Sequence, residues 1–214
     1  MNSSLELFKA LNSFDYPVSE RDEYWWNKSG TFEVVVGAIL TQQTKWENVE
    51  KSLLALEESI CISLESIVKS DIKYLGELIK SSGFYNRKAK YLKLISKAIL
   101  DDFVDFEIFK GEVSREWLLS QKGIGQESAD SILCYACYRD ILVIDSYTDR
   151  ILRAFGYEFE SYEEIQEWMS SGIYSENLCK TYALYHANIV EYAKRHIKGK
   201  NVDIEPLKRA LSHL

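Results

Sequence analysis

A chain of 214 residues, 46% of them hydrophobic, is long enough to bury one large core or two smaller ones. Its net charge of −7 argues against a broad, non-specific binder of polyanions, because such proteins are normally basic. The longest apolar run, residues 34–40, is far too short for a membrane span, and the first residues lack the pattern of a signal peptide. We therefore expect a cytoplasmic protein without membrane contact, whose four cysteines stay reduced.

Apolar residues recur at helical spacing along almost the whole chain, for example over residues 5–11, 32–40 and 91–99. Glycines separate these segments. Ser161-Tyr-Glu-Glu164 has the pattern of a capping box that opens a helix reaching Trp168. The one strand-like run, residues 141–144, is too short and too isolated to indicate a sheet. The pattern predicts an all-α fold.

The segment from Trp117 to Leu133 predicts two helices joined by a tight hairpin at Gly123-Ile124-Gly125. Glycine tolerates positive φ and leaves the backbone bare. The first amides of the second helix have no partner within that helix, so they can donate to a phosphate. Such contacts would grip nucleic acid with little net positive charge. An ordinary turn between two helices explains the glycines equally well.

Asp145 follows the apolar run and precedes another helical pattern. An aspartate in that place is first of all a helix N-cap. A capping carboxylate at a domain junction can also face a ligand, so both roles remain open. Cys134-Tyr-Ala-Cys137 lies within a helical pattern and lacks a partner pair of ligands, which favours buried small residues over a metal or redox site.

Gly123-Ile-Gly125-x-x-Ser-Ala129, followed by Asp145, resembles the signature of the helix-hairpin-helix (HhH-GPD), endonuclease III-like DNA glycosylases. Two further segments agree with that resemblance. Residues 32–44 resemble the family's early helix, which ends in a glutamine turn that probes the base stack. Residues 82–89 resemble its Gly-Phe/Leu-Tyr-x-x-Lys-Ala segment. The likeness runs from about residue 28 to residue 155.

The resemblance implies a two-lobed fold. Residues 28–139 would form a helical barrel lobe with the hairpin, and residues 1–27 and 140–214 a second, discontinuous all-α lobe. The resemblance also implies an active site in a cleft. A base flipped out of duplex DNA would enter this cleft, because its glycosidic bond cannot be reached inside the stack. The residues expected to contact DNA are Gln43, Lys88, Gly123, Ile124, Gly125, Gln126 and Ser128.

One departure from the family pattern concerns the nucleophile. Bifunctional members attack the sugar with a lysine, and this chain has Glu127 in that place, which cannot form an imine. The resemblance therefore implies a monofunctional glycosylase, a hydrolase without AP lyase activity. Asp145 would support the positive charge that develops on the sugar and would orient or deprotonate the attacking water, as carboxylates do in glycoside hydrolysis.

A second departure concerns metal. Many members end in four cysteines that hold an iron–sulfur cluster. In this chain Cys179 is the last cysteine, and the corresponding positions are approximately Glu191, Lys198, Asn201 and Leu207. We therefore expect no iron–sulfur cluster and no other cofactor. The resemblance leaves room for a monovalent cation at carbonyls near Gly123 and Gly125.

Three tryptophans, Trp25, Trp26 and Trp46, map near the cleft mouth in this family. They could be plain core between the lobes. They could instead form an aromatic sandwich for an alkylated purine such as 3-methyladenine, whose positive charge is attracted to electron-rich ring faces. Together with Glu127 and the missing cluster, they resemble the 3-methyladenine DNA glycosylase III branch, originally described in epsilon-proteobacteria; Asn27 departs from the proline expected there.

Glu127 and Lys194 are further candidates for the base-binding pocket, and two alternative functions complete the expectations. Lys194 is the best candidate for a pocket wall in the basic stretch at 194–196, although exposed helix charge explains that stretch more simply. One alternative is a mismatch- or uracil-type glycosylase, but neutral bases demand hydrogen-bond readout or acid assistance. The other is a non-catalytic DNA-binding module, for which the acidic charge is the weak point. The expected protein is a bacterial monomer that acts on duplex DNA with an alkylated base, in base excision repair.

Overall fold

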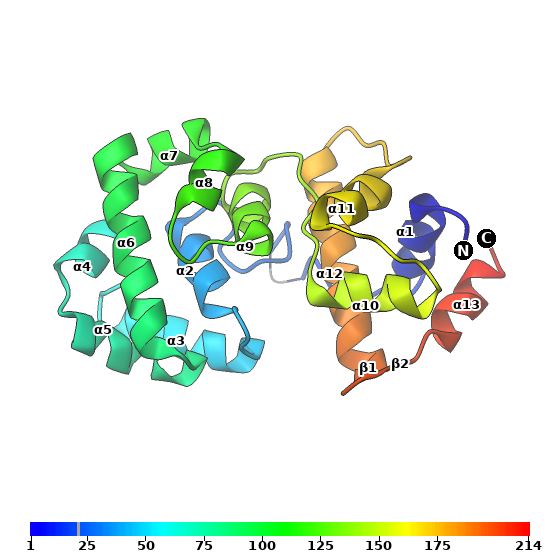
Figure 1. Ribbon diagram of the computed structural model, residues 1–214, viewed down its shortest axis with the longest axis horizontal. Coiled ribbons are helices and arrows are strands. Elements are labelled where there is room, and N and C mark those ends of the chain that lie inside the picture. Colours follow the sequence, from blue (N-terminus) through cyan, green and yellow to red (C-terminus); the bar gives the residue numbers. More distant parts are fainter. Residues whose placement is uncertain (21) are drawn as a thin grey trace. The chain divides into compact units, whose positions relative to one another are not determined.

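The computed structural model describes residues 1–20 and 22–214, and in these ranges the chain is mainly helical (Figure 1). The prediction of an all-α fold is confirmed, apart from one hairpin of two very short strands. The chain divides into two compact units. We call residues 28–137 the middle unit, and residues 1–27 together with 138–214 the terminal unit. No helix in the described ranges is both long enough and apolar enough to cross a membrane.

The middle unit is built around α2 (Phe32–Leu40), all of whose residues are buried. Apart from Glu33, α2 is apolar on all sides, and such a helix belongs inside a core. It contacts α3, α6 and α9. The longest helix of this unit, α6, packs against α4 and α5 (Figure 1). The helices of this unit are α2, α3 (Trp46–Glu58), α4 (Leu64–Lys69), α5 (Ile72–Leu78), α6 (Tyr85–Phe103), α7 (Phe106–Glu112), α8 (Arg115–Ser120) and α9 (Gln126–Ser131), with a 3-10 helix at Lys80–Ser82 and a π-helical turn at Ile132–Ala136.

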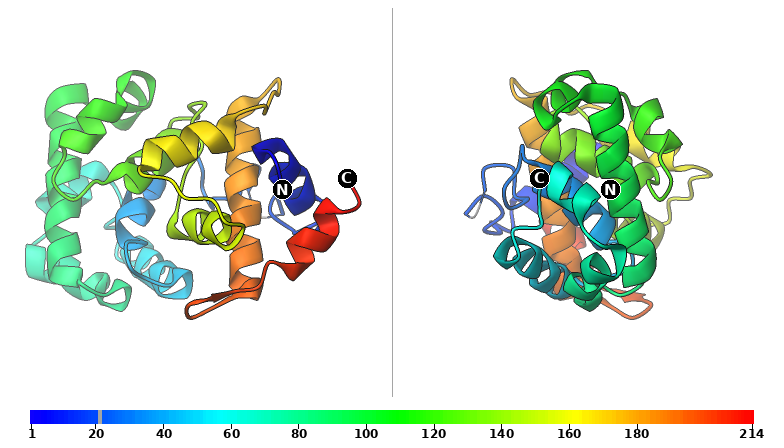
Figure 2. Two further views of the ribbon diagram at one scale, coloured as in Figure 1. Left: turned by 45° about the vertical axis from the view of Figure 1, so that its right-hand side comes forward. Right: turned by 90° about the vertical axis from the view of Figure 1, so that its left-hand side faces the viewer.

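The terminal unit is built from both parts of the chain that flank the middle unit. Its central helix, α12, contacts α1 and α10, and α1 also packs beside α13 (Figure 2). The core between them contains the fully buried side chains of Leu7, Tyr185 and Leu207. The elements of this unit are α1 (Ser4–Asn12), α10 (Ser146–Ala154), α11 (Tyr162–Ser170), α12 (Leu178–His196), β1 (Ile197–Lys198), β2 (Asn201–Val202) and α13 (Glu205–Leu211).

Local signals set where the helices of the terminal unit begin. Ser161 caps α11 as predicted, since its side chain accepts from the Glu164 amide at 3.1 Å. The Glu164 carboxylate accepts from the amide of Glu160 instead of that of Ser161, so the capping box is shifted by one residue. The apolar run at residues 142–144 is buried but is not a strand, and it leads directly into the cap of α10.

Candidate active site

Asp145 is the N-cap of α10, which is the structural role that its sequence context indicates. Its Oδ1 accepts two hydrogen bonds from Thr148, one from the backbone amide and one from the hydroxyl, both at 2.8 Å. Thr148 is itself buried. These two bonds fix the orientation of the carboxylate and occupy one oxygen, which leaves Oδ2 as the oxygen available for other chemistry.

The second oxygen of Asp145 faces a histidine from another helix. His186 Nε2 lies 3.5 Å from Asp145 Oδ2, and the side chains are only 6% and 10% exposed. Burial acts to raise the pKa of Asp145, but His186 and the two hydrogen bonds from Thr148 outweigh it, and the pKa lies below its ordinary value. The carboxylate is therefore ionised at neutral pH, although it is almost completely shielded from water.

Trp25 lies against the same histidine. Its ring meets the His186 ring edge to face, with centroids 5.6 Å apart and planes at 87°. The backbone of Trp25 has φ +71°, a region that bulky residues seldom adopt and that persists only where the surroundings enforce it. An enforced conformation at an aromatic residue that contacts the histidine facing a buried carboxylate is typical of a functional site.

The geometry of the two adjacent tryptophans corrects one part of the sequence prediction. The rings of Trp25 and Trp26 are perpendicular, at 88°, with centroids 6.4 Å apart. Perpendicular rings cannot form the two parallel walls of one aromatic sandwich. Trp26 is only 7% exposed and belongs to the core, whereas Trp25 is partly exposed and is the one of the pair whose ring can meet a ligand.

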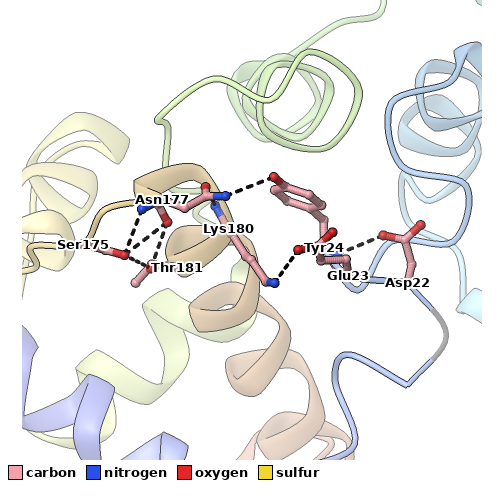
Figure 3. A network of polar contacts seen from close by, with 7 residues as sticks. All are labelled: Asp22, Glu23, Tyr24, Ser175, Asn177, Lys180 and Thr181. Atoms are coloured by element: carbon pink, nitrogen blue, oxygen red, sulfur yellow. Dashed lines mark hydrogen bonds and ion pairs between the residues drawn. The ribbon is translucent and has the colours of Figure 1, made fainter.

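Polar contacts hold the segment before Trp25 on the first turn of α12 (Figure 3). The side-chain amide of Asn177, the N-cap residue of α12, donates to the Tyr24 hydroxyl at 3.3 Å. Lys180 forms an ion pair with Glu23 at 2.5 Å. The Tyr24 amide donates to the Asp22 carboxylate at 2.8 Å. Because α12 also carries His186, one helix positions both the aromatic and the imidazole neighbours of the site.

Sequence reasoning assigned no role to His186. The only signal was a histidine on the apolar face of α12, between the buried residues Tyr185 and Ala187. A lone histidine of this kind is uninformative without knowledge of what it faces. Its contact with Asp145 joins two helices that are not neighbours in the chain, so spacing cannot predict it.

The predicted hairpin lies between α8 and α9 in the middle unit. Gly123 has φ +95°, and Gly125 is the exposed N-cap of α9. No side chain caps the first amides of α9, and Glu127 is exposed in its first turn. Ile124 is buried, at 7% exposure, so its side chain fastens the hairpin to the core. Gln126 is half-buried.

Gln42, the neighbour of the glutamine singled out in the sequence, ties α2 to this hairpin. Its Nε2 donates to the Gly123 carbonyl at 2.8 Å and to Ser128 Oγ at 3.1 Å. Ser128 is only 7% exposed and its hydroxyl is hydrogen-bonded inside the unit, so this side chain has a structural role. The Gly123 carbonyl, which was expected to lie near a monovalent cation, thus accepts a hydrogen bond from Gln42. Gln43 is exposed, with φ +54°.

Lys88 differs most from expectation. Its side chain is buried, at 2% exposure for the residue, and its ammonium donates to the Leu40 carbonyl, Thr44 Oγ1 and the Ser82 carbonyl at 2.7 to 2.8 Å. An ammonium whose three donors are all used inside the protein cannot also bind a phosphate. The prediction that Lys88 contacts DNA through its charge is therefore wrong, and its role is internal.

One expected pocket residue, Lys194, lies away from Asp145 along α12, and another, Trp46, belongs to the middle unit. Lys194 forms an exposed ion pair with Glu191 at 2.7 Å, about 12 Å further along α12 than His186 at the usual helical rise. Trp46 is the first residue of α3, in the middle unit, and is half-buried. The structure thus brings together Asp145, Trp25 and Trp26 from the sequence prediction and adds His186.

No metal centre is built from the described residues. Within residues 1–20 and 22–214, no three His, Cys, Asp or Glu side chains come together as a metal site requires. All four cysteines are buried, and none of them forms a disulfide. At the approximate positions of the family's cluster ligands, Leu207 is part of the hydrophobic core and Asn201 pairs with Lys198 in the β1–β2 hairpin. These residues do not fit an iron–sulfur cluster.

Gly123→Ala is expected to lower the stability of the middle unit by about 1–3 kcal/mol, the range for an enforced left-handed residue. A Cβ at Gly123 would come within 2.3 Å of the Tyr91 ring. The matched control is Gly125→Ala, because a Cβ there meets nothing within 4 Å and its φ of −99° is ordinary. Thermal unfolding of both variants checks this, and equal melting temperatures would contradict it.

Comparison with known proteins identifies the family. The model of the HhH-GPD superfamily of base excision DNA repair proteins matches residues 36–173. A relative from Methanocaldococcus jannaschii, which carries the name of a DNA repair glycosylase, is 41% identical over 186 residues, 82% of each chain.

Solved structures agree. The 3-methyladenine DNA glycosylase MagIII of H. pylori, bound to 1,N6-ethenoadenine, is 41% identical with a TM-score of 0.86, covering 92% of this chain and all of that one. A non-covalent endonuclease III–DNA complex shares the fold, with 18% identity, a TM-score of 0.77 and coverage of 98% and 95%. The resemblance found in the sequence is confirmed, and the chain belongs to the HhH-GPD superfamily of base excision DNA repair proteins.

Proposed function

We propose that this protein is a monofunctional DNA glycosylase that releases alkylated purines such as 3-methyladenine from duplex DNA by base flipping and attack of water. The observation that carries this proposal is a buried, ionised carboxylate, Asp145, placed next to an enforced aromatic residue, Trp25, through His186. The 41% identity to a glycosylase crystallised with a modified purine supports the substrate class.

The protonation state of Asp145 favours an alkylated base over a neutral one. A carboxyl whose pKa lies below its ordinary value stays ionised at neutral pH, so it cannot donate a proton to a leaving base. Thymine and uracil are poor leaving groups and gain from such assistance. A cationic alkylpurine departs without it and is attracted to the face of an aromatic ring such as Trp25. The same carboxylate supports the positive charge that develops on the sugar.

Water is the proposed nucleophile. Asp145 Oδ1 is saturated by Thr148, and Oδ2 remains to accept a hydrogen bond from the water that attacks the sugar. At the place where bifunctional relatives have a lysine, Glu127 offers no amine and cannot form a covalent imine with the sugar. The reaction would therefore leave an intact strand with an abasic site.

The hairpin is proposed to hold the DNA backbone. No side chain caps the first turn of α9, which begins behind the exposed Gly125. Amides at a helix start bind phosphate oxygens well, which suits a protein with a net charge of −7. Gln43 and Gln126 are the neighbouring side chains proposed to touch the duplex.

We also propose that the protein works without an iron–sulfur cluster. In the segment after His196, hydrophobic packing of Leu207 and the antiparallel pair Ile197–Val202 hold the chain. The Tyr192 hydroxyl adds a hydrogen bond to the Asp203 carbonyl at 2.5 Å. These contacts supply the cross-linking that a cluster would otherwise provide.

The test is release of bases from a duplex treated with a methylating agent, followed by chromatography of the free bases. We expect 3-methyladenine among the products, an intact strand until alkali is added, and no trapping on DNA with borohydride. Duplexes with uracil or a thymine mismatch form the second arm. Release of only these neutral bases would reassign the substrate, and binding without release of any base would contradict the glycosylase proposal.

His186→Gln is expected to slow base release about tenfold, equivalent to about 1.4 kcal/mol of barrier. Glutamine places an amide donor about where His186 Nε2 lies, but it lacks the ring that meets Trp25 and cannot take up a proton to support the Asp145 carboxylate. Single-turnover kinetics at saturating enzyme measure the effect. His213→Gln is the matched control, because His213 is exposed near the C-terminus. Equal rates of base release for the two variants would show that His186 has no role in the reaction.

A further inference from the structure

Two turns of the middle unit have unusual backbones at their exposed tips. We call residues 41–45 the glutamine turn and residues 80–84 the phenylalanine turn. Gln43 has φ +54° and Phe84 has φ +45°, both in the left-handed region that residues with a side chain seldom adopt. Phe84 is 56% exposed, with the Arg87 guanidinium 4.9 Å from its ring. An exposed aromatic ring with a cation over it contributes little to the stability of the fold, and it is suited to stacking on a nucleic acid base.

The buried ammonium of Lys88 joins these two turns. It donates to the Leu40 carbonyl, where α2 ends and the glutamine turn begins, and to the Thr44 hydroxyl within that turn. Its third bond goes to the Ser82 carbonyl in the phenylalanine turn. The Thr44 hydroxyl in turn donates to the same Ser82 carbonyl. One cation thus satisfies acceptors from both turns at once.

The glutamine turn is also fastened on its other side. Gln42 donates to the Gly123 carbonyl and to Ser128, so this turn is connected with the hairpin as well. Three segments that are distant in the chain are therefore held together by two side chains, Gln42 and Lys88. Gln43, which lies at the tip of the glutamine turn, has an exposed side chain.

The acceptors around the Lys88 ammonium require a cation. Two carbonyls and a hydroxyl converge on one point, and only an ammonium can donate three hydrogen bonds from a single atom. Burial and the positive charge of Arg87 lower the pKa of Lys88 to about 8, so the amine still carries its proton at neutral pH. A buried charge is costly, and the cost is offset here only because all three donors are used.

We propose that Lys88 is a positioning residue for duplex recognition, which ties the glutamine turn to the phenylalanine turn so that Gln43 and Phe84 meet the DNA at a fixed separation. The inference rests on the proposed function, since it concerns how the duplex is bound. It assigns Lys88 no contact with the DNA itself. The two left-handed tips are conformations that the local sequence does not favour, so their positions depend on this tie.

The test uses Lys88→Met, with Lys90→Met as the matched control. Lys90 is exposed on the same helix, so its replacement removes the same charge without touching the turns. Fluorescence anisotropy with a duplex that contains a tetrahydrofuran abasic analogue gives Kd. Single-turnover release from methylated duplex at saturating enzyme gives the chemical step. For Lys88→Met we expect Kd to rise about tenfold with the saturated rate unchanged, and for Lys90→Met a change in Kd of at most about twofold.

A double-mutant cycle with Gln43→Ala separates positioning from general loss of structure. If Lys88 acts through the glutamine turn, Gln43→Ala weakens binding in the wild type but has little further effect in Lys88→Met. Active-site titration corrects for any misfolded fraction, which would lower the amplitude and leave Kd unchanged. Additive effects, or an unchanged Kd in Lys88→Met, would overturn the inference.

Thr44→Val provides a milder variant in case Lys88→Met does not fold. Valine keeps the shape of threonine but removes the hydroxyl that accepts from Lys88 and donates to Ser82. We expect the same change in Kd in the same direction, about threefold. Wild-type protein that binds the abasic analogue but releases no base would contradict the proposed function, and the cycle would still decide the role of Lys88 from binding alone.

Discussion

Asp145→Asn is expected to slow the release of 3-methyladenine by about 10²–10⁴-fold, the usual range for removal of a positioned acid–base group. Asparagine ranks with aspartate as an N-cap, and its carbonyl can still accept from the Thr148 amide and hydroxyl. The variant therefore loses the negative charge beside His186 while keeping the start of α10. Single-turnover base release from methylated duplex measures the effect, and thermal unfolding verifies that the fold is retained.

Asp149→Asn is the matched control for this prediction. Asp149 lies in the first turn of the same helix and pairs with the exposed Arg153, so its replacement changes the same charge outside the site. We expect near wild-type base release from it. If Asp145→Asn releases bases as fast as Asp149→Asn does, Asp145 is a helix cap and nothing more, and the catalytic carboxylate has to be sought elsewhere.

Arg115→Met is expected to lower the free energy of unfolding by about 3–5 kcal/mol, because it leaves a buried carboxylate without its arginine. The Asp130 side chain is 0% exposed and is paired in two places, Nε to Oδ1 at 2.7 Å and Nη2 to Oδ2 at 3.2 Å. This pair joins the two helices of the hairpin, α8 and α9. Chemical denaturation followed by circular dichroism measures the loss.

A second variant identifies the cause of that loss. The double replacement Arg115→Met with Asp130→Leu removes both charges, and buried ion pairs replaced by apolar residues of similar size often lose little stability. We expect it to recover most of the loss. Arg153→Met, which breaks an exposed pair, should leave the denaturation midpoint nearly unchanged. A double variant as unstable as Arg115→Met would show that packing, and not the loss of the arginine charge beside Asp130, determines the result.

Much of the fold could be predicted because its signals are local. Helical spacing gave the all-α class, and the glycines at 123 and 125 located the hairpin between α8 and α9. The position of Asp145 after an apolar run identified its capping role. Each of these features depends on residues within one or two turns of each other, so a single sequence contains the information.

The remaining features depend on acceptors and rings that are distant in the chain. Lys88 reads as a surface cation until the Leu40 and Ser82 carbonyls are seen to converge on it. The perpendicular rings of Trp25 and Trp26 and the positive φ of Trp25 depend on the surroundings of these residues, which their residue types do not reveal. His186 becomes informative only through the carboxylate that it faces.

The discontinuity of the terminal unit has a consequence for the order in which the protein forms during synthesis. The middle unit is one unbroken stretch, so its helices can pack as soon as residue 137 has left the ribosome. The segment that carries Trp25 must wait, because the ion pair of Glu23 with Lys180 spans 157 residues and the Ser4 contact with Tyr185 spans 181. Nascent chains would therefore present a folded hairpin well before α12 completes the surroundings of Asp145.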